Sequence, residues 1–222
     1  MLSFVPFSHT FVRTVGHYLP MMAGAAVAHS RATPLLAEDL LTVRPTILIS
    51  VPRIFERIYA KIQSQLAKKA VSRRLFAWAV AVGCQRFQHS QGRAARHISE
   101  LCWPLLNALV AGKIMAKLGG RLRGAICGGA PLSNDIARVF IGLGMPLLQG
   151  YGLTETSPVI SANLFDDNDP ASVGIPLRDV EVRIGNDGEL LARSPGVCMG
   201  YWNQPEASAA LIDRDGWLHS GD

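Results

Sequence analysis

Two apolar runs that each end in a glycine turn constrain the fold of this chain most strongly. The first run, Leu122 to Cys127, ends in Gly128-Gly129-Ala130-Pro131, and the second, Met145 to Leu148, ends in Gln149-Gly150-Tyr151-Gly152. Between them, Ser133 or Asn134 is suited to cap a helix. Strand, helix and strand in this order predict a βαβ unit with parallel strands. Both glycine turns then lie at the carboxyl ends of neighbouring strands, where open α/β sheets bind ligands.

The second turn carries side chains suited to a nucleotide. Tyr151 offers a planar ring between two glycines, Thr154 a hydroxyl and Glu155 a carboxylate. A ring, a hydroxyl and a hard oxygen ligand at a strand end fit a nucleotide with a metal ion. Taken alone, the stretch also fits a plain strand-to-loop turn with an exposed tyrosine. The first glycine turn beside it favours the nucleotide site.

Residues 1–158 are predicted to form an α/β subdomain, a parallel sheet with helices on both faces. Apolar runs at Met1 to Phe7 and Thr46 to Val51 indicate further strands. A helical insertion is expected at about residues 53–118, where the strand signal is almost lost. His9 follows the first run at a ligand-binding edge, although a lone histidine there also fits a structural role.

Residues 159–222 have a different pattern. Two short alternating runs flank Asn186-Asp187-Gly188, which is a hairpin signal. A small antiparallel sheet or barrel is therefore expected here. The last residues, Asp215 to Asp222, end on a turn signal, so we expect this subdomain to be incomplete.

Composition limits the remaining possibilities. The chain has 222 residues and 49% hydrophobic content, which excludes a disordered protein. The longest apolar runs are too short to span a bilayer, and no signal peptide or paired-cysteine pattern is visible, so a cytoplasmic protein is expected. Fourteen Lys or Arg residues lie between Arg53 and Arg123 against two acids. This basic helical segment is either a solvated face or a peripheral contact with the anionic inner face of a membrane. Nucleic acid is not expected, because aromatic residues do not interleave with the bases.

Four motifs together resemble those of the adenylate-forming (AMP-binding) acyl-CoA synthetases. They are Gly128-Gly129-Ala130-Pro131, Gln149 to Glu155, Gly196-Val197-Cys198-Met199-Gly200-Tyr201-Trp202 and Asp215 to Asp222. Pro6-Phe7-Ser8-His9 with Gly16-His17-Tyr18 is similar to the long-chain fatty acyl-CoA synthetase branch. The resemblance covers essentially the whole chain and implies a central part of that family's large N-terminal domain.

The resemblance implies a two-step ligase that uses ATP, Mg²⁺ and coenzyme A. A fatty acid and ATP form an acyl-adenylate, and coenzyme A then displaces AMP. The backbone of Gly128, Gly129, Ala130 and Pro131 and the segment Gln149, Gly150, Tyr151 and Gly152 would hold AMP, with Tyr151 stacked on the adenine. The remaining implied roles are the α-phosphate for Thr154, Mg²⁺ for Glu155, the ribose for Asp222 and the acyl site for His9.

The resemblance also implies parts that these residues do not contain. A Ser/Thr/Gly-rich phosphate loop is expected before Met1, and a domain with a catalytic lysine after Asp222. We therefore expect the 222 residues alone to be inactive. Two alternatives remain: an acyl-AMP ligase that passes its acyl group to a carrier protein, and a non-catalytic module that binds a membrane or nucleic acid.

Overall fold

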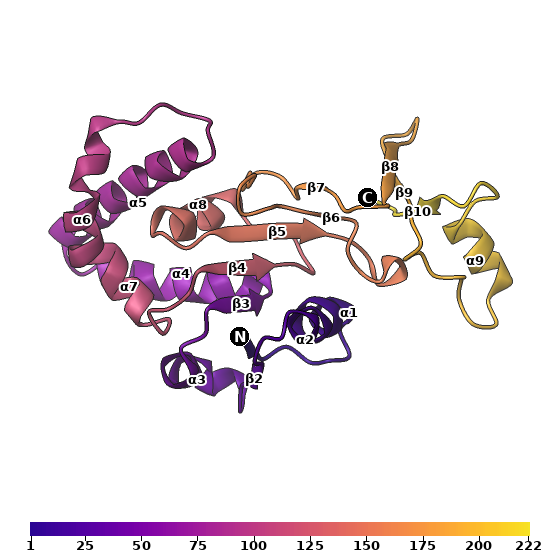
Figure 1. Cartoon of the computed structure of the whole chain (residues 1–222), viewed down its shortest axis with the longest axis horizontal. Coiled ribbons are helices and arrows are strands. Elements are labelled where there is room, and N and C mark those ends of the chain that lie inside the picture. The colour runs from indigo at the N-terminus through magenta and orange to yellow at the C-terminus, as the bar shows by residue number, and fades with distance from the viewer.

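A seven-stranded sheet runs through the molecule in the order β2-β1-β3-β4-β5-β6-β7, as seen in the computed structural model, which describes residues 1–222 (Figure 1). The strands are β1 (Leu2–Ser3), β2 (Ala28–His29), β3 (Ile47–Ser50), β4 (Gly124–Cys127), β5 (Leu147–Tyr151), β6 (Ser161–Ala162) and β7 (Ile175–Pro176). The pairs from β2 to β5 are parallel, and β5–β6 and β6–β7 are antiparallel. The predicted α/β class with a mainly parallel sheet is confirmed.

The predicted βαβ unit is also confirmed. Strands β4 and β5 pair in parallel, with Cys127 opposite Gln149, and helix α8 (Asn134–Gly142) connects them. Ser133 is the residue before the helix, but its side chain makes no capping hydrogen bond. The register places both glycine turns at one edge of the sheet.

Helices cover both faces of the sheet because strand side chains alternate between the faces. On one face, Leu48 and Ala125 lie in the main core with helices α3 (Leu36–Val43), α4 (Pro52–Leu66) and α8. On the other face, Ile49 packs against α1 (Thr10–Arg13), which continues through the π-helical turn η1 (Thr14–Tyr18) into α2 (Leu19–Met22). A 3-10 turn, η2 (Thr33–Leu35), precedes α3.

A wholly helical segment separates β3 from β4. It consists of α4, α5 (Ala70–Ser90), the 3-10 turn η3 (Ile98–Cys102), α6 (Trp103–Leu106), the π-helical turn η4 (Asn107–Ala111) and α7 (Gly112–Ala116). Helix α5 crosses α8 very closely, since a Cβ atom on Gly83 would lie 1.8 Å from the carbonyl oxygen of Gly142. The segment is thereby fixed to the sheet through α8.

The end of this segment has a property that the apolar runs of the sequence did not indicate. The stretch Ile98–Ala116 is long and apolar enough to cross a membrane by length and composition alone. Apolar runs in the sequence did not reveal it, because Glu100, Asn107 and Lys113 interrupt the stretch. In the folded chain, Leu106 and Ala111 of this stretch are fully buried against neighbouring helices.

The C-terminal part forms a separate antiparallel sheet of three strands, not a barrel. The strands are β8 (Glu181–Ile184), β9 (Leu190–Arg193) and β10 (Leu218–His219), in the order β10-β9-β8. The predicted hairpin at Asn186-Asp187-Gly188 joins β8 to β9, and Gly188 has the positive φ of 90° that such turns favour. Strands β6 and β7 remain in the large sheet beyond residue 158, where the sequence places the start of the second subdomain.

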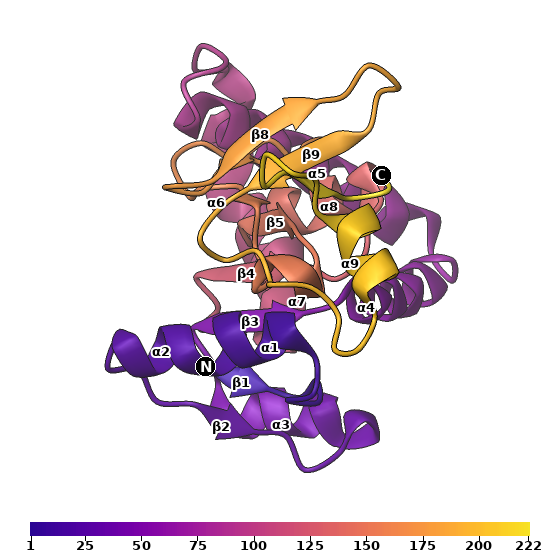
Figure 2. The same cartoon turned by 90° about the vertical axis from the view of Figure 1, so that its right-hand side faces the viewer.

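Two features of the C-terminal part had no sequence prediction. Helix α9 (Pro205–Leu211) begins with Pro205, a residue favoured in the first helical turn. The guanidinium groups of Arg183 and Arg193 both lie over the ring of Trp217, at 4.2 and 4.7 Å from its centre. In Figure 1 the strand β5 points toward the small sheet, and in Figure 2 the strands β8 and β9 of that sheet lie in front of β5.

Asp39 gives the N-terminal region a pH-dependent link. Its carboxylate accepts hydrogen bonds from the Ser30 hydroxyl at 2.7 Å and from the Arg31 backbone and guanidinium at 3.0 and 2.7 Å. The Ser30 hydroxyl and then Arg31 lower the pKa of Asp39. A carboxyl whose pKa is lower in the folded state stabilises the fold above the unfolded pKa of about 3.9, and this stability is lost as pH falls through the native pKa.

We expect Asp39→Asn to lower the melting temperature at pH 7, and the difference from the wild type to shrink as pH falls below about 4. Thermal unfolding from pH 7 to pH 3 measures this. Glu38→Gln is the matched control, because Glu38 contacts the same Arg31 at 3.1 Å but its side chain is 67% exposed. A difference that stays constant with pH would contradict the assignment.

Candidate functional site

The carboxyl ends of β3, β4 and β5 meet at one edge of the sheet and form the floor of the candidate site. Ser50, Cys127 and Gln149 are partners across the three strands. The backbone N–H of Gly128 donates to the Ser50 carbonyl at 3.3 Å, so the first glycine turn starts directly at this edge. Gly129, Ala130 and Pro131 are exposed there.

The first glycine turn lies against the start of α1. A Cβ atom on Gly128 would lie 2.8 Å from the ring of Phe11, so a larger residue would displace this ring. A Cβ on Gly129, whose φ is 84°, would lie 3.5 Å from the ring of His9. His9 is exposed at the residue before α1. The structure therefore brings His9 and the Gly128–Pro131 turn together, although 119 residues separate His9 from Gly128.

The second glycine turn is held by its own backbone. A Cβ atom on Gly152 would lie 1.8 Å from the carbonyl oxygen of Pro158, which excludes any larger residue without a rearrangement. The hydroxyl of Thr156 accepts from Leu153 N–H at 3.0 Å and donates to the Pro158 carbonyl at 3.0 Å. This closes the 3-10 turn η5 (Thr154–Thr156) and leaves Thr154 exposed.

Gln149 differs from the other predicted residues of this turn. Its side chain is buried, and its amide donates to the Pro170 carbonyl at 2.8 Å. The side chain is thus used to hold the chain that follows β6. Its carbonyl accepts from Asn163 N–H at 2.9 Å, so the side chain and the carbonyl are both used within the protein.

Tyr151 and Asp222 come together although they are 71 residues apart in the sequence. The Tyr151 hydroxyl donates to the Asp222 carboxylate at 2.5 Å. Burial, and then the Asp222 carboxylate, raise the pKa of Tyr151 to about 12, so the phenol keeps its proton at neutral pH. The small sheet positions Asp222, since Leu190 N–H donates to the Asp222 carbonyl at 3.0 Å and Gly221 N–H donates to Glu189 at 2.8 Å.

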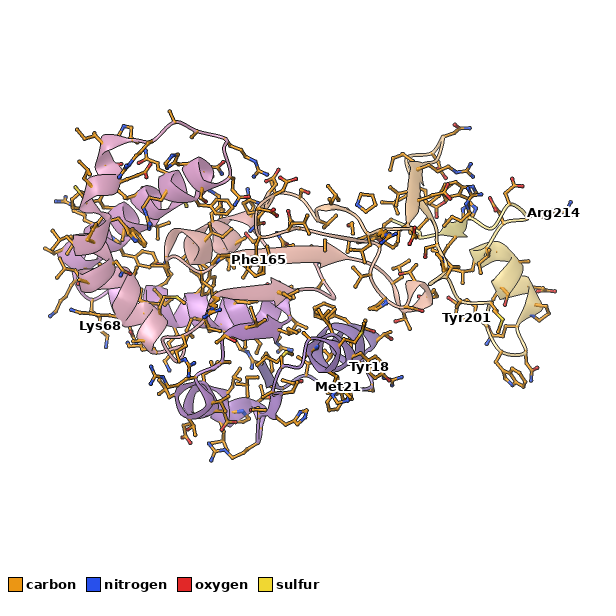
Figure 3. All side chains as sticks on the ribbon, viewed as in Figure 1. Tyr18, Met21, Lys68, Phe165, Tyr201 and Arg214 are labelled. Carbon is orange, nitrogen blue, oxygen red and sulfur yellow. The ribbon has the colours of Figure 1, made fainter.

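Glu155 has a partner to which the sequence assigned no role. The hydroxyl of Tyr201 donates to its Oε1 atom at 2.7 Å, and Cys198 N–H donates to its backbone carbonyl at 2.8 Å. The carboxylate raises the pKa of Tyr201 because it accepts a hydrogen bond from the protonated phenol. Figure 3 labels Tyr201 on the segment between the small sheet and α9. Tyr201 lies in one of the recognised motifs, but 46 residues separate it from Glu155, and no local pattern links the two.

The site suits Mg²⁺ that is bound together with substrate phosphates more than a metal ion enclosed by protein side chains alone. The structure has no group of three or more His, Cys, Asp or Glu side chains that could enclose a metal. Mg²⁺ is usually held by one or two carboxylates with substrate phosphates and water. Tyr201 contacts the Oε1 atom of Glu155. The Oε2 atom therefore remains available as one such ligand, and the exposed Thr154 is the preceding residue.

Comparison with known proteins gives consistent matches over this chain. The family described as AMP-binding enzyme matches residues 1–202. The long-chain-fatty-acid–CoA ligase FadD15 of Mycobacterium bovis is 33% identical over 100% of this chain and 36% of its own length. The peroxisomal long chain acyl-CoA synthetase 7 of Arabidopsis thaliana is 34% identical over 100% of this chain and 33% of its own length. The chain thus spans about a third of the length of these relatives.

Solved structures with the same fold align with the whole length of this chain. MatB from Rhodopseudomonas palustris matches with a TM-score of 0.66 and 21% identity, over 36% of its chain. The A-PCP didomain of carboxylic acid reductase from Segniliparus rugosus, solved in complex with AMP, matches with a TM-score of 0.67 and 26% identity, over 28% of its chain.

Proposed function

Because this chain belongs to the AMP-binding enzyme family, we propose that it forms the AMP side of the active site in an ATP-dependent long-chain fatty acid–CoA ligase. The observation that carries the proposal is the contact of Tyr151 with Asp222 at the carboxyl edge of the sheet. It places a ring and a carboxylate at the same edge of the sheet as the first glycine turn, where Gly129, Ala130 and Pro131 are exposed. The names of the curated relatives support a fatty acid as the substrate.

The residues of the site have complementary tasks in this proposal. The adenine stacks on Tyr151 and lies against the backbone of Gly128–Pro131, where the exposed Gly129 has no side chain and allows close approach. Asp222 accepts hydrogen bonds from the vicinal hydroxyls of the ribose, as acidic residues do in other nucleotide folds. Its second oxygen remains available, since Tyr151 contacts only Oδ2. The Tyr151 hydroxyl thereby fixes the ribose acceptor relative to the adenine platform.

The phosphate end of the site lies on η5. Thr154 donates its hydroxyl to the α-phosphate, and Glu155 holds the metal ion. Mg²⁺, when bound, neutralises charge that develops on the phosphate oxygens. Tyr201 restrains Glu155 by its 2.7 Å hydrogen bond and so keeps the carboxylate directed at one position. His9, next to Gly129, lies on the side where the fatty carboxylate approaches.

In the proposed reaction, an oxygen of the fatty carboxylate bonds to the α-phosphorus of ATP, and pyrophosphate leaves. The sulfur of coenzyme A then bonds to the acyl carbon and AMP leaves, while the thiol proton is released. Preorganised groups that act together stabilise both transition states. The phosphate loop and lysine expected from the resemblance are not among these residues, so we propose that the 222 residues bind AMP without forming acyl-CoA.

Calorimetric titration tests this proposal. We expect the chain to bind AMP and, more tightly, a non-hydrolysable long-chain acyl-adenylate, because the latter adds contacts at the acyl side. GMP is the control ligand, since its base differs while its ribose and phosphate are the same. Equal heats with AMP and GMP, or no saturable binding of either adenylate, would contradict the proposed function.

Tyr201→Phe should weaken binding of MgATP by about two- to tenfold, because Glu155 loses the donor that restrains it. Binding of AMP measured in EDTA should not change, since Glu155 then has no metal to hold. Titrations of both ligands against the wild type and the variant measure this difference. An equal loss for both ligands would indicate a general structural role for Tyr201.

We also propose a peripheral contact with the anionic, cytoplasmic face of a membrane. The basic helical segment between β3 and β4 supports it, because cationic surfaces attract anionic lipid headgroups. Fatty acids partition into bilayers, so this location would bring the enzyme to its substrate.

A further inference from the structure

The helical segment exposes a row of large apolar side chains. Ile98, Leu101, Leu105 and Leu109 are 78%, 67%, 58% and 45% exposed, and we call these four residues the apolar strip. Their spacing of three, four and four residues puts them on one face of the continuous helical stretch from η3 through η4. Isolated exposed leucines are normal on a protein surface, but a row on one helix face indicates an interaction site.

The opposite side of the same stretch is packed into the protein. Leu106 and Ala111 are fully buried, and Leu106 contacts Ala79 and Val82 of α5. The stretch is therefore held flat on the body of the molecule. This arrangement fits a helix that lies in a membrane surface, and it does not fit a helix that crosses the membrane.

The charges around the strip have one sign. Glu100 is the single acid between Glu56 and Asp135. Its carboxylate is buried, accepts from the backbone N–H of His97 at 3.0 Å and lies 3.4 Å from the His89 ring. It therefore offers no exposed negative charge beside the strip.

Several exposed lysines lie on the same helical end of the molecule. Lys113 follows Leu109 by one helical turn and is exposed. The exposed Lys117 donates to Gln65 at 3.3 Å, which joins the end of α7 to the end of α4, where Lys68 is also exposed. Figure 3 labels Lys68 on this end, next to α7. The strip is thus accompanied by cations that no neighbouring acid neutralises.

We propose that the apolar strip inserts into the boundary between headgroups and acyl chains of an anionic membrane leaflet, while the accompanying lysines contact lipid phosphates. The inference rests on the peripheral membrane contact proposed above and identifies the face that makes it. Leucines favour the acyl region, and lysines near its border favour anionic headgroups. A second copy of this chain is a poorer occupant, because self-association through the strip would bring lysines against lysines.

Co-flotation with vesicles tests the inference. The wild-type chain should bind vesicles that contain phosphatidylglycerol in phosphatidylcholine at least about tenfold more tightly than pure phosphatidylcholine vesicles. The triple variant Leu101→Ser, Leu105→Ser, Leu109→Ser should bind the anionic vesicles at least about tenfold more weakly, because three apolar side chains no longer enter the acyl region.

The matched control is Met21→Ser, Met22→Ser. Both methionines are more than half exposed, at 61% and 86%, but they lie at the end of α2, away from the apolar strip. Figure 3 labels Met21 far from Lys68. This variant should bind vesicles as the wild type does. Retained circular dichroism and AMP binding in the triple variant show that its fold is intact.

Three outcomes would overturn the inference and are distinguishable. If the triple variant binds anionic vesicles as tightly as the wild type while Lys113→Gln, Lys117→Gln does not, the contact is electrostatic and no insertion occurs. If the wild type binds no vesicles but still binds AMP, the membrane contact fails and the proposed nucleotide site stands. If sedimentation shows a dimer that the triple variant dissociates, the strip is covered by a second copy.

Discussion

Tyr151→Ala should weaken AMP binding by about 5- to 150-fold, because stacking of a base on an aromatic ring contributes about 1–3 kcal/mol. The ring lies at the end of β5 and is only partly buried. Alanine removes this platform and also removes the donor to Asp222. Titration calorimetry of AMP against the wild type and the variant measures the change.

Tyr151→Phe separates the two contributions. It keeps the ring and loses the 2.5 Å hydrogen bond to Asp222, so we expect a loss of no more than about tenfold. Equal losses for Ala and Phe would show that the hydroxyl, not the stacking face, carries the effect. Unchanged binding in both variants would place the adenine elsewhere.

Phe140→Ala should lower the free energy of unfolding by about 3–5 kcal/mol, as for other fully buried phenylalanines. Phe140 on α8 is 0% exposed and packs edge-on against Phe55 of α4, with ring centres 5.3 Å apart. Its removal leaves a cavity between the two helices that cover the main core. Urea unfolding followed by circular dichroism measures the loss.

Trp202→Ala is the matched control for this variant. Trp202 is also a large aromatic residue, but it is 89% exposed, so its removal should change stability by less than about 0.5 kcal/mol. A loss for Phe140→Ala below about 1 kcal/mol would contradict the tight packing between α4 and α8, because a site that collapses fully leaves no cavity.

Local patterns in the sequence predicted the part of the fold that holds the site. The runs Leu122 to Cys127 and Met145 to Leu148 are each apolar and each end in a glycine turn. Two parallel strands joined by one crossover helix bury both runs compactly. The structure confirms this pairing and places Gly128 and Tyr151 at one edge. Their binding roles remain predictions. The hairpin at Asn186-Asp187-Gly188 was equally predictable, because its turn chemistry is local.

Contacts between distant segments escaped prediction for a physical reason. Tyr201 meets Glu155 because the small sheet folds back onto η5, and that geometry depends on packing between two subdomains. The exposed apolar strip was missed because its residues are separated by polar and buried ones, so that they align only when the helix forms. Helix α9 is short, and one proline at its start was a weak signal.

The central claim is that AMP binds at the edge formed by the two glycine turns and Asp222. Assigned backbone amide NMR spectra of the wild-type chain, recorded during an AMP titration, test it most directly. We predict saturable shifts at Gly128, Gly129, Tyr151, Gly152 and Asp222, and none at the apolar strip on the other end of the molecule. Saturable shifts confined to residues outside this edge, with Tyr151 and Asp222 unmoved, would contradict the account.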